Sequence, residues 1–131
     1  MKPIKALFLS CCLAASVHAA DARPPTVSMV QLLANPESFN ERRVAVGGFL
    51  SFEHEGSALY LHADDFEHQL RKNALWVFIP KSQANRECFD RKYVVVIGTV
   101  KSKSFGHMGA YSGSIEIERL VSSGPPEPGC T

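Results

Sequence analysis

Two adjacent glycines in the middle of the first β-like run constrain this fold more than any other feature of the sequence. The run spans residues 42–53, and Gly47-Gly48 lies at its centre. Its apolar residues recur at every second position and so share one face of a strand: Val44, Val46, Leu50 and Phe52. Glycine inside a strand is typical of a bulge or a sharp bend. We therefore expect a sheet that bends, as the wall of a small barrel does.

Four more β-like runs follow, at residues 57–63, 73–80, 92–100 and 113–121. The run 92–100 is apolar on both faces, which is typical of a central strand. The last run alternates, which predicts Ile115, Ile117 and Val121 on its buried face. Five short strands with a bend in the first predict a mainly β fold, a five-stranded OB-like barrel.

Two short helices are predicted beside the barrel. A capping-box pattern, Ser28-x-x-Gln31, begins the first one near the N-terminus. Residues 64–72 predict the second, with acidic residues at its start and basic residues at its end. This second helix lies between the second and third strands of the barrel.

The first 19 residues have the pattern of an export signal. Two lysines precede an apolar run, residues 6–17, which is too short to span a bilayer. Val17-His18-Ala19 fits the small-residue rule for cleavage after Ala19. We expect a cleaved signal peptide at residues 1–19 and a periplasmic or secreted protein. No second apolar run of the sequence is long enough for a membrane span.

A lipoprotein signal is the alternative, because such a signal ends at a cysteine, here Cys11 or Cys12. The preceding residues, Phe8-Leu9-Ser10, make a poor lipobox, and the apolar run before them would be very short. We expect both cysteines to leave with the signal peptide.

The mature chain is expected to be one domain with a tail tied to it. Residues 20–26 form a linker, residues 27–121 the OB-like barrel domain and residues 122–131 a Pro/Gly-rich tail. Cys88 and Cys130 remain after cleavage, and in an exported protein we expect them to form a disulfide that pins the tail. Two free thiols are the alternative.

Charge excludes one class of partner. The 14 Lys and Arg residues nearly balance the 13 Asp and Glu residues, and the two signs are interspersed. No basic patch stands out, so we expect no nucleic-acid partner. We also expect no cofactor and a monomeric protein.

The two loops that flank the binding face of an OB-fold carry the candidate site. They are "FEHEGSA", residues 52–58, and "KSKSFGHMGAYSG", residues 101–113. The predicted ligand-binding residues are His54, Tyr60, His62, His107 and Tyr111. Tyrosine rings offer stacking surface, and glycines allow close backbone approach. The alternative is structural: the glycines only shape the loop, His107 bonds a carbonyl, and Tyr111 packs over a barrel end.

Metal binding is a weaker alternative. Residue types that zinc prefers are present but scattered: His54, His62, His107, Glu53 and Glu55. They show no His-x-His or His-x-x-x-His spacing, so we expect no metal site.

Catalysis has less support. Ser112 or Ser114 with His107 as base would suit a nucleophile. No Gly-x-Ser-x-Gly elbow is present, and a strand-loop-strand setting does not suit that elbow. We expect no catalytic residue and no enzyme activity.

Several segments together resemble a family of small exported bacterial proteins. They are "LLANPESFNERRVAVGGFL", "EGSALYLHADDF", "NALWVFIP", "KYVVVIGTV" and "GHMGAYSGSI", and they cover about residues 27–120. The resemblance implies an OB-like fold. It carries no established activity and no catalytic residues to this chain.

Two functional classes remain open. The first is an exported periplasmic binding module that holds an envelope protein, a glycan or a small ligand on its loop face. A glycan or small ligand predicts a concave face lined by Tyr60, Trp76 and Tyr111. The second class is an inhibitor, an immunity-type protein or an assembly accessory protein. It predicts a protruding rigid loop with His107 at its tip.

Overall fold

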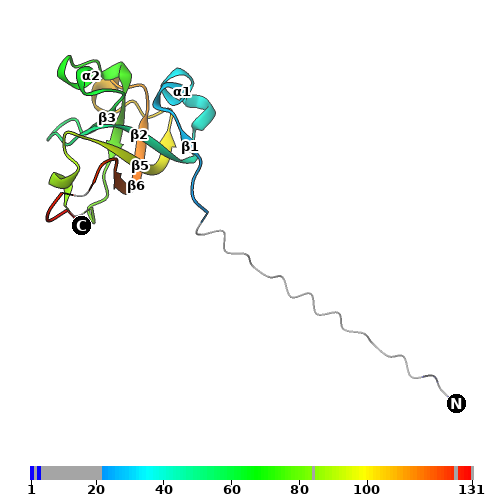
Figure 1. Cartoon of the computed structure of the whole chain (residues 1–131). Coiled ribbons are helices and arrows are strands. Elements are labelled where there is room, and N and C mark those ends of the chain that lie inside the picture. The colour runs from blue at the N-terminus through cyan, green and yellow to red at the C-terminus, as the bar shows by residue number, and fades with distance from the viewer. Residues whose placement is uncertain (2, 4–21, 84, 126, 131) are drawn as a thin grey trace.

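The structure, a computed structural model, describes residues 1, 3, 22–83, 85–125 and 127–130 (Figure 1). The predicted signal peptide and its cleavage site therefore lie almost entirely outside the described residues. The strands are β1 (Thr26–Val27), β2 (Arg43–Ser51), β3 (Ala58–Tyr60), β4 (Ala74–Phe78), β5 (Lys92–Lys101) and β6 (Ser114–Ser122). The α-helices are α1 (Met29–Ala34) and α2 (Ala63–Glu67). Four 3-10 turns lie between them, at Pro36–Phe39, Arg71–Asn73, Arg86–Cys88 and His107–Gly109.

Five of these strands close into a barrel, which confirms the predicted fold class. The sheet order is β1-β2-β3-β4-β6-β5, and a further pairing of β2 with β5 closes the ring. β4 and β6 run parallel, whereas the other barrel pairs are antiparallel. This is a mainly β, OB-like barrel, with the two-residue β1 added in parallel on β2.

The barrel interior is filled by alternate residues of every strand. Their side chains are nearly all aliphatic, and α1 closes one end with Met29 and Leu32. The buried strand residues of this first core are Val27, Val44, Val46, Leu50, Leu59, Leu75, Val77, Val94, Val96, Val100, Ile115, Ile117 and Leu120. The period-two pattern of the sequence therefore identified the inner wall.

The end of β6 differs from the prediction because the strand carries a bulge. The pairing with β5 shifts between Ile97 and Gly98, so Glu118 has no direct partner across the ladder. The extra residue reverses the alternation that follows it. Leu120 is therefore buried, at 8% exposure, whereas Val121 is 42% exposed. The prediction that Val121 faces inward with Ile115 and Ile117 was wrong.

Gly48 of the glycine pair in β2 permits close packing, and the pair forms no bulge in the ladder with β5. The ladder from β2 to β5 runs without a break from Arg43 to Leu50. A Cβ atom at Gly48 would lie 2.7 Å from the backbone oxygen of Tyr60 and 2.9 Å from Cγ of Leu59. Glycine is needed there because β3 passes too close for any side chain.

Both helices form, but α2 is shorter than expected. In α1 the Ser28 hydroxyl accepts a hydrogen bond from Gln31 N, and the Gln31 side chain accepts one from Ser28 N, so the predicted capping box is present. The second helix was predicted over residues 64–72 but ends at Glu67. Gln69 adopts a left-handed conformation, with φ 55°, and a separate 3-10 turn follows.

The predicted disulfide is present and ties the C-terminal segment to the barrel. Cys88 and Cys130 are bonded, with their Cα atoms 5.6 Å apart. An ion pair between Lys92 and Glu127, at 2.7 Å, adds a second contact. Figure 1 shows the C-terminal end beside the segment that follows β4. Within the described ranges, no helix has the length and apolar character that crossing a membrane requires.

Candidate functional site

A second apolar core covers the outer face of β2, β3 and β4. Its buried members are Phe49, Ala58, Tyr60, Ala74 and Tyr111, and Phe66 of α2 and Trp76 of β4 pack against them. OB-folds bind oligonucleotides and oligosaccharides on the outer face of their second and third strands. In this chain the same face is occupied by α2 and by the loop between β5 and β6.

The rings of this second core contact one another edge to face. The centroids of Tyr60 and Phe66 lie 5.5 Å apart, and those of Trp76 and Tyr111 lie 5.4 Å apart. Tyr60 is 2% exposed and Tyr111 3% exposed. The expected concave face is therefore not open to a ligand at Tyr60 and Tyr111, whose rings pack against the chain itself, whereas Trp76 is partly exposed.

The hydroxyl groups of the two tyrosines form a chain at the edge of this core. The Tyr60 hydroxyl is hydrogen-bonded to that of Tyr111, which in turn donates to the Gly56 carbonyl at 3.5 Å. The pKa of Tyr60 is raised to about 12, mainly by burial and also by the neighbouring Tyr111 hydroxyl and the charge of Glu53, whereas the charge of Arg71 lowers it. Both tyrosines thus join the barrel to the loops above it.

A hollow of about 470 Å³ lies outside this core, between the loops. Residues of the β2–β3 loop, the β5–β6 loop and the turn before β4 line it: Glu53, His54, Glu55, Gly56, Arg71, His107, Met108 and Tyr111. Of the five predicted residues, the structure therefore brings together His54, His107 and Tyr111. Tyr60 lies in the second core, and His62 lies exposed at the start of α2.

Two lining residues were missed by the sequence analysis. Arg71 was assigned to the end of a helix, and Met108 was not considered at all. Met108 is 89% exposed and has φ 55°, so it projects from the tip of the loop. A large apolar residue between His107 and Gly109 in a polar loop was the available signal.

The β5–β6 loop is fixed to the barrel by contacts along its length. Lys72 Nζ donates to the carbonyl oxygens of Gly109 at 3.3 Å and Tyr111 at 3.2 Å. The Ser112 hydroxyl donates to the Lys72 carbonyl at 2.6 Å. Gly106 lies directly on the Trp76 ring, where a Cβ would approach within 2.7 Å. The β5–β6 loop is therefore held against the barrel, and it forms one wall of the hollow.

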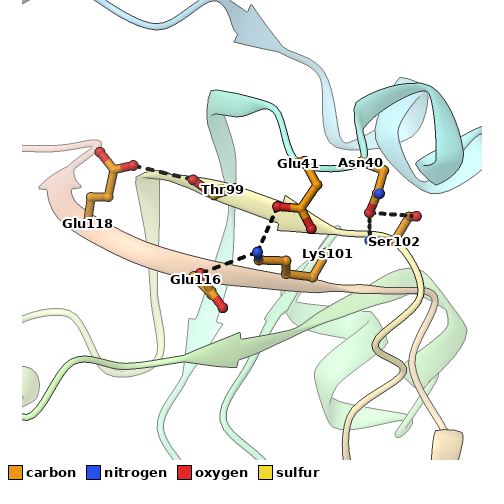
Figure 2. A network of polar contacts seen from close by, with 7 residues as sticks. All are labelled: Asn40, Glu41, Thr99, Lys101, Ser102, Glu116 and Glu118. Atoms are coloured by element: carbon orange, nitrogen blue, oxygen red, sulfur yellow. Dashed lines mark hydrogen bonds and ion pairs between the residues drawn. The ribbon is translucent and has the colours of Figure 1, made fainter. Parts of the chain in front are cut away.

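The base of the same loop is held by a polar network (Figure 2). The Asn40 side-chain oxygen accepts hydrogen bonds from both the backbone N and the hydroxyl of Ser102, each at 3.0 Å. Lys101 Nζ lies between Glu41, at 2.8 Å, and Glu116, at 3.8 Å. The hydrogen bond to Glu41 raises the pKa of Lys101. These contacts fix the point at which β5 ends and the loop begins.

The charges around the hollow do not form a metal site. Among the residues that the structure describes, no group of three or more His, Cys, Asp or Glu side chains is arranged to hold a metal ion. The hollow instead presents carboxylates, a guanidinium group and two imidazoles at separate positions on its wall. Such a wall suits hydrogen bonds and ion pairs to a ligand of several atoms.

Comparison with known proteins supports the fold alone. No protein-family model and no curated protein matches this chain. The structure is similar to a DUF3299 family protein from Pseudomonas aeruginosa PAO1, with a TM-score of 0.54 and 9% identity over 81% of this chain and 100% of that chain. A protein assigned as an aspartyl-tRNA synthetase from Leishmania major Friedlin gives a TM-score of 0.47 and 10% identity, over 88% of this chain and 23% of its own.

Proposed function

We propose that this protein is an exported periplasmic binding module that acts through its loop face and without catalysis. The observation that carries the proposal is the hollow between the β2–β3 and β5–β6 loops, which is lined by His54, Arg71 and His107. Its walls are held in place by buried tyrosines and by Lys72, so a ligand meets a preformed surface.

Export is supported by the pattern of the first 19 residues and by the disulfide. Disulfides persist in oxidising compartments such as the bacterial periplasm. The bond between Cys88 and Cys130 is therefore what an exported domain would use to secure its tail. The resemblance to small exported bacterial proteins agrees with this compartment.

The serines considered as nucleophiles are engaged in structural contacts. Ser114 is buried and its hydroxyl donates to the Ser104 carbonyl at 2.6 Å. The Ser112 hydroxyl donates to the Lys72 carbonyl at the same distance. A nucleophile needs a general base within hydrogen-bond reach. These contacts support binding rather than acyl transfer.

A protein partner is the second candidate, in the class of inhibitors, immunity-type proteins and assembly accessory proteins. Met108 favours it, because this apolar side chain projects almost fully exposed from a loop that is held before it by the contact of Gly106 with Trp76 and after it by Lys72. Exposed apolar anchors on rigid loops are typical of protein interfaces. A glycan ligand loses support, because two of the three aromatic rings expected to stack on a sugar, Tyr60 and Tyr111, are buried.

The test uses the protein expressed with its own leader and recovered from the periplasm. We would identify bound proteins by mass spectrometry and bound small molecules by native mass spectrometry. The variant His54→Ala/His107→Ala removes two exposed groups from the hollow, and His62→Ala is the matched control outside it. We expect the ligand to be lost from the double variant and retained by the control. A ligand retained by all three proteins would place binding elsewhere.

A further inference from the structure

The hollow carries opposite charges that do not neutralise each other. Arg71 lines it and donates a hydrogen bond to the Gln69 side chain at 3.1 Å. Glu53 and Glu55 line it from the β2–β3 loop. Within residues 22–83, no ion pair within 4.0 Å joins Arg71 to either carboxylate. The positive charge of Arg71 and the negative charges of Glu53 and Glu55 are thus available to pair with a ligand in the hollow.

Glu53 and the Tyr111 hydroxyl share the floor of the hollow beside Gly56. A Cβ at Gly56 would lie 3.3 Å from the Tyr111 hydroxyl and 3.6 Å from Oε2 of Glu53. Glu53, Gly56 and Tyr111 all line the hollow, so the carboxylate and the hydroxyl lie near each other at its wall. A carboxylate next to a hydroxyl is a suitable acceptor for an ammonium group.

Arg71 approaches the same floor from the turn before β4. Its charge lowers the pKa of Tyr60, whereas the charge of Glu53 raises it. Both charges therefore lie within electrostatic range of the same buried hydroxyl. Arg71 and Glu53 line the same hollow as Tyr111, so one ligand in the hollow meets both charges.

The shape and charge of this site select one class of ligand. An anion alone would be repelled by Glu53 and Glu55, and a cation alone by Arg71. We propose that the hollow binds short peptides by both free termini, with the α-carboxylate on Arg71 and the α-ammonium group on Glu53. The guanidinium group suits a carboxylate because it can donate two parallel hydrogen bonds. This inference rests on the proposed loop-face function.

The volume agrees with a ligand of this size. About 470 Å³ lies within the range of sites that hold small molecules, which is roughly 300–1,000 Å³. His107 and Met108 form the rim, where an imidazole can hydrogen-bond a peptide group and a thioether can cover an apolar side chain.

The test is a titration of the full chain with triglycine, followed by the amide signals in NMR spectra. N-acetyl-triglycine and triglycinamide each remove one terminal charge. We expect triglycine to shift the signals of the hollow, and each cap to weaken its binding about fivefold or more. Arg71→Gln should remove the difference between triglycine and its amide while keeping the penalty for acetylation. Glu53→Gln should remove the difference between triglycine and N-acetyl-triglycine while keeping the penalty for the amide cap.

Conservative and distant variants keep the result interpretable. Arg71→Lys keeps the positive charge and should retain the preference for a free carboxylate, and the exposed Arg119→Gln should leave every affinity unchanged. The inference fails if triglycine shifts no signal of the hollow, or if caps and charge variants have no selective effect. In that case the proposed function still stands if the His54→Ala/His107→Ala variant loses the periplasmic ligand, and both fail if it does not.

Discussion

Gly106 lies flat on the indole ring of Trp76, and the two residues join the β5–β6 loop to the outer face of the barrel. A Cβ at Gly106 would come within 2.7 Å of three Trp76 side-chain atoms. Gly106 also has φ 65° and ψ −159°, a conformation essentially restricted to glycine. The contact with Trp76 explains why the β5–β6 loop has a glycine at position 106.

Replacement of Gly106 by alanine should therefore cost about 3 kcal/mol of unfolding free energy, from backbone strain and overpacking together. Gly109 is the matched control, because it also has a positive φ, 66°, but a Cβ there meets nothing within 4 Å. Gly109→Ala should cost about 1 kcal/mol. Urea unfolding of both variants measures the difference, and equal losses would show that the contact with Trp76 adds nothing.

Replacement of Asn40 by alanine should destabilise the base of the loop. Ser102 is buried, and both its backbone N–H and its hydroxyl donate to the Asn40 side chain. Two buried donors without an acceptor should cost about 2 kcal/mol. Chemical denaturation measures this loss of unfolding free energy, and the hydrogen-exchange rates of the amides of residues 102–113 should increase.

The control for that variant is Glu41→Gln, which removes the exposed partner of Lys101 in the neighbouring ion pair. Exposed ion pairs contribute little to stability. A loss as large as that of Asn40→Ala would mean that the ion pair, not the buried amide, fixes the loop.

The raised pKa of Tyr60 predicts a loss of stability at high pH. The pKa is about 12 in the folded chain and 10.0 for an unperturbed tyrosine, so the protonated form is favoured by folding. The contribution of Tyr60 to the free energy of unfolding is complete below about pH 10 and is lost between about pH 10 and 12. Urea unfolding at pH 8 and pH 11 should show a larger fall for the wild type than for Tyr60→Phe. Equal falls would mean that Tyr60 titrates normally.

Reduction of the disulfide should lower stability and free the tail. The bond closes a loop between positions 42 residues apart, for which the chain-entropy model gives about 4 kcal/mol. The unfolding midpoint of the oxidised protein should exceed that of Cys88→Ser/Cys130→Ser. The intact oxidised protein should also be two hydrogen masses lighter than the reduced one. Identical masses would show that the thiols are free.

The barrel could be predicted because its strands obey period-two alternation, but the alternation fails after one inserted residue. Nothing in the sequence near Glu118 marks the bulge, so Val121 was assigned to the wrong face. The two-residue β1 is too short to give any pattern. The end of α2 depends on the left-handed Gln69, a residue without a strong turn preference.

The loops of the candidate site could be located from the sequence, whereas the burial of Tyr60 could not, and the burial of Tyr111 was one of two alternatives. A tyrosine on the outward side of a strand, such as Tyr60, is exposed unless other segments cover it, and here α2 and the distant β5–β6 loop do so. The aromatic residues at outward strand positions were the available signal: Phe49, Tyr60 and Trp76. So much apolar surface on one face is rarely left in water. Arg71 was assigned to the end of the second helix, but it lies in the separate 3-10 turn that follows the early end of α2.

The ladder between β2 and β5 also determines how this protein must fold. It pairs Arg43 with Thr99 and Leu50 with Lys92, so its partners are far apart in the chain. Domains dominated by such distant pairings fold in milliseconds to seconds, because a long loop must be closed before the contacts form. Until β5 pairs with it, β2 has an unpaired edge, and two of its residues are Val44 and Val46. Aggregation therefore competes with barrel closure at that step.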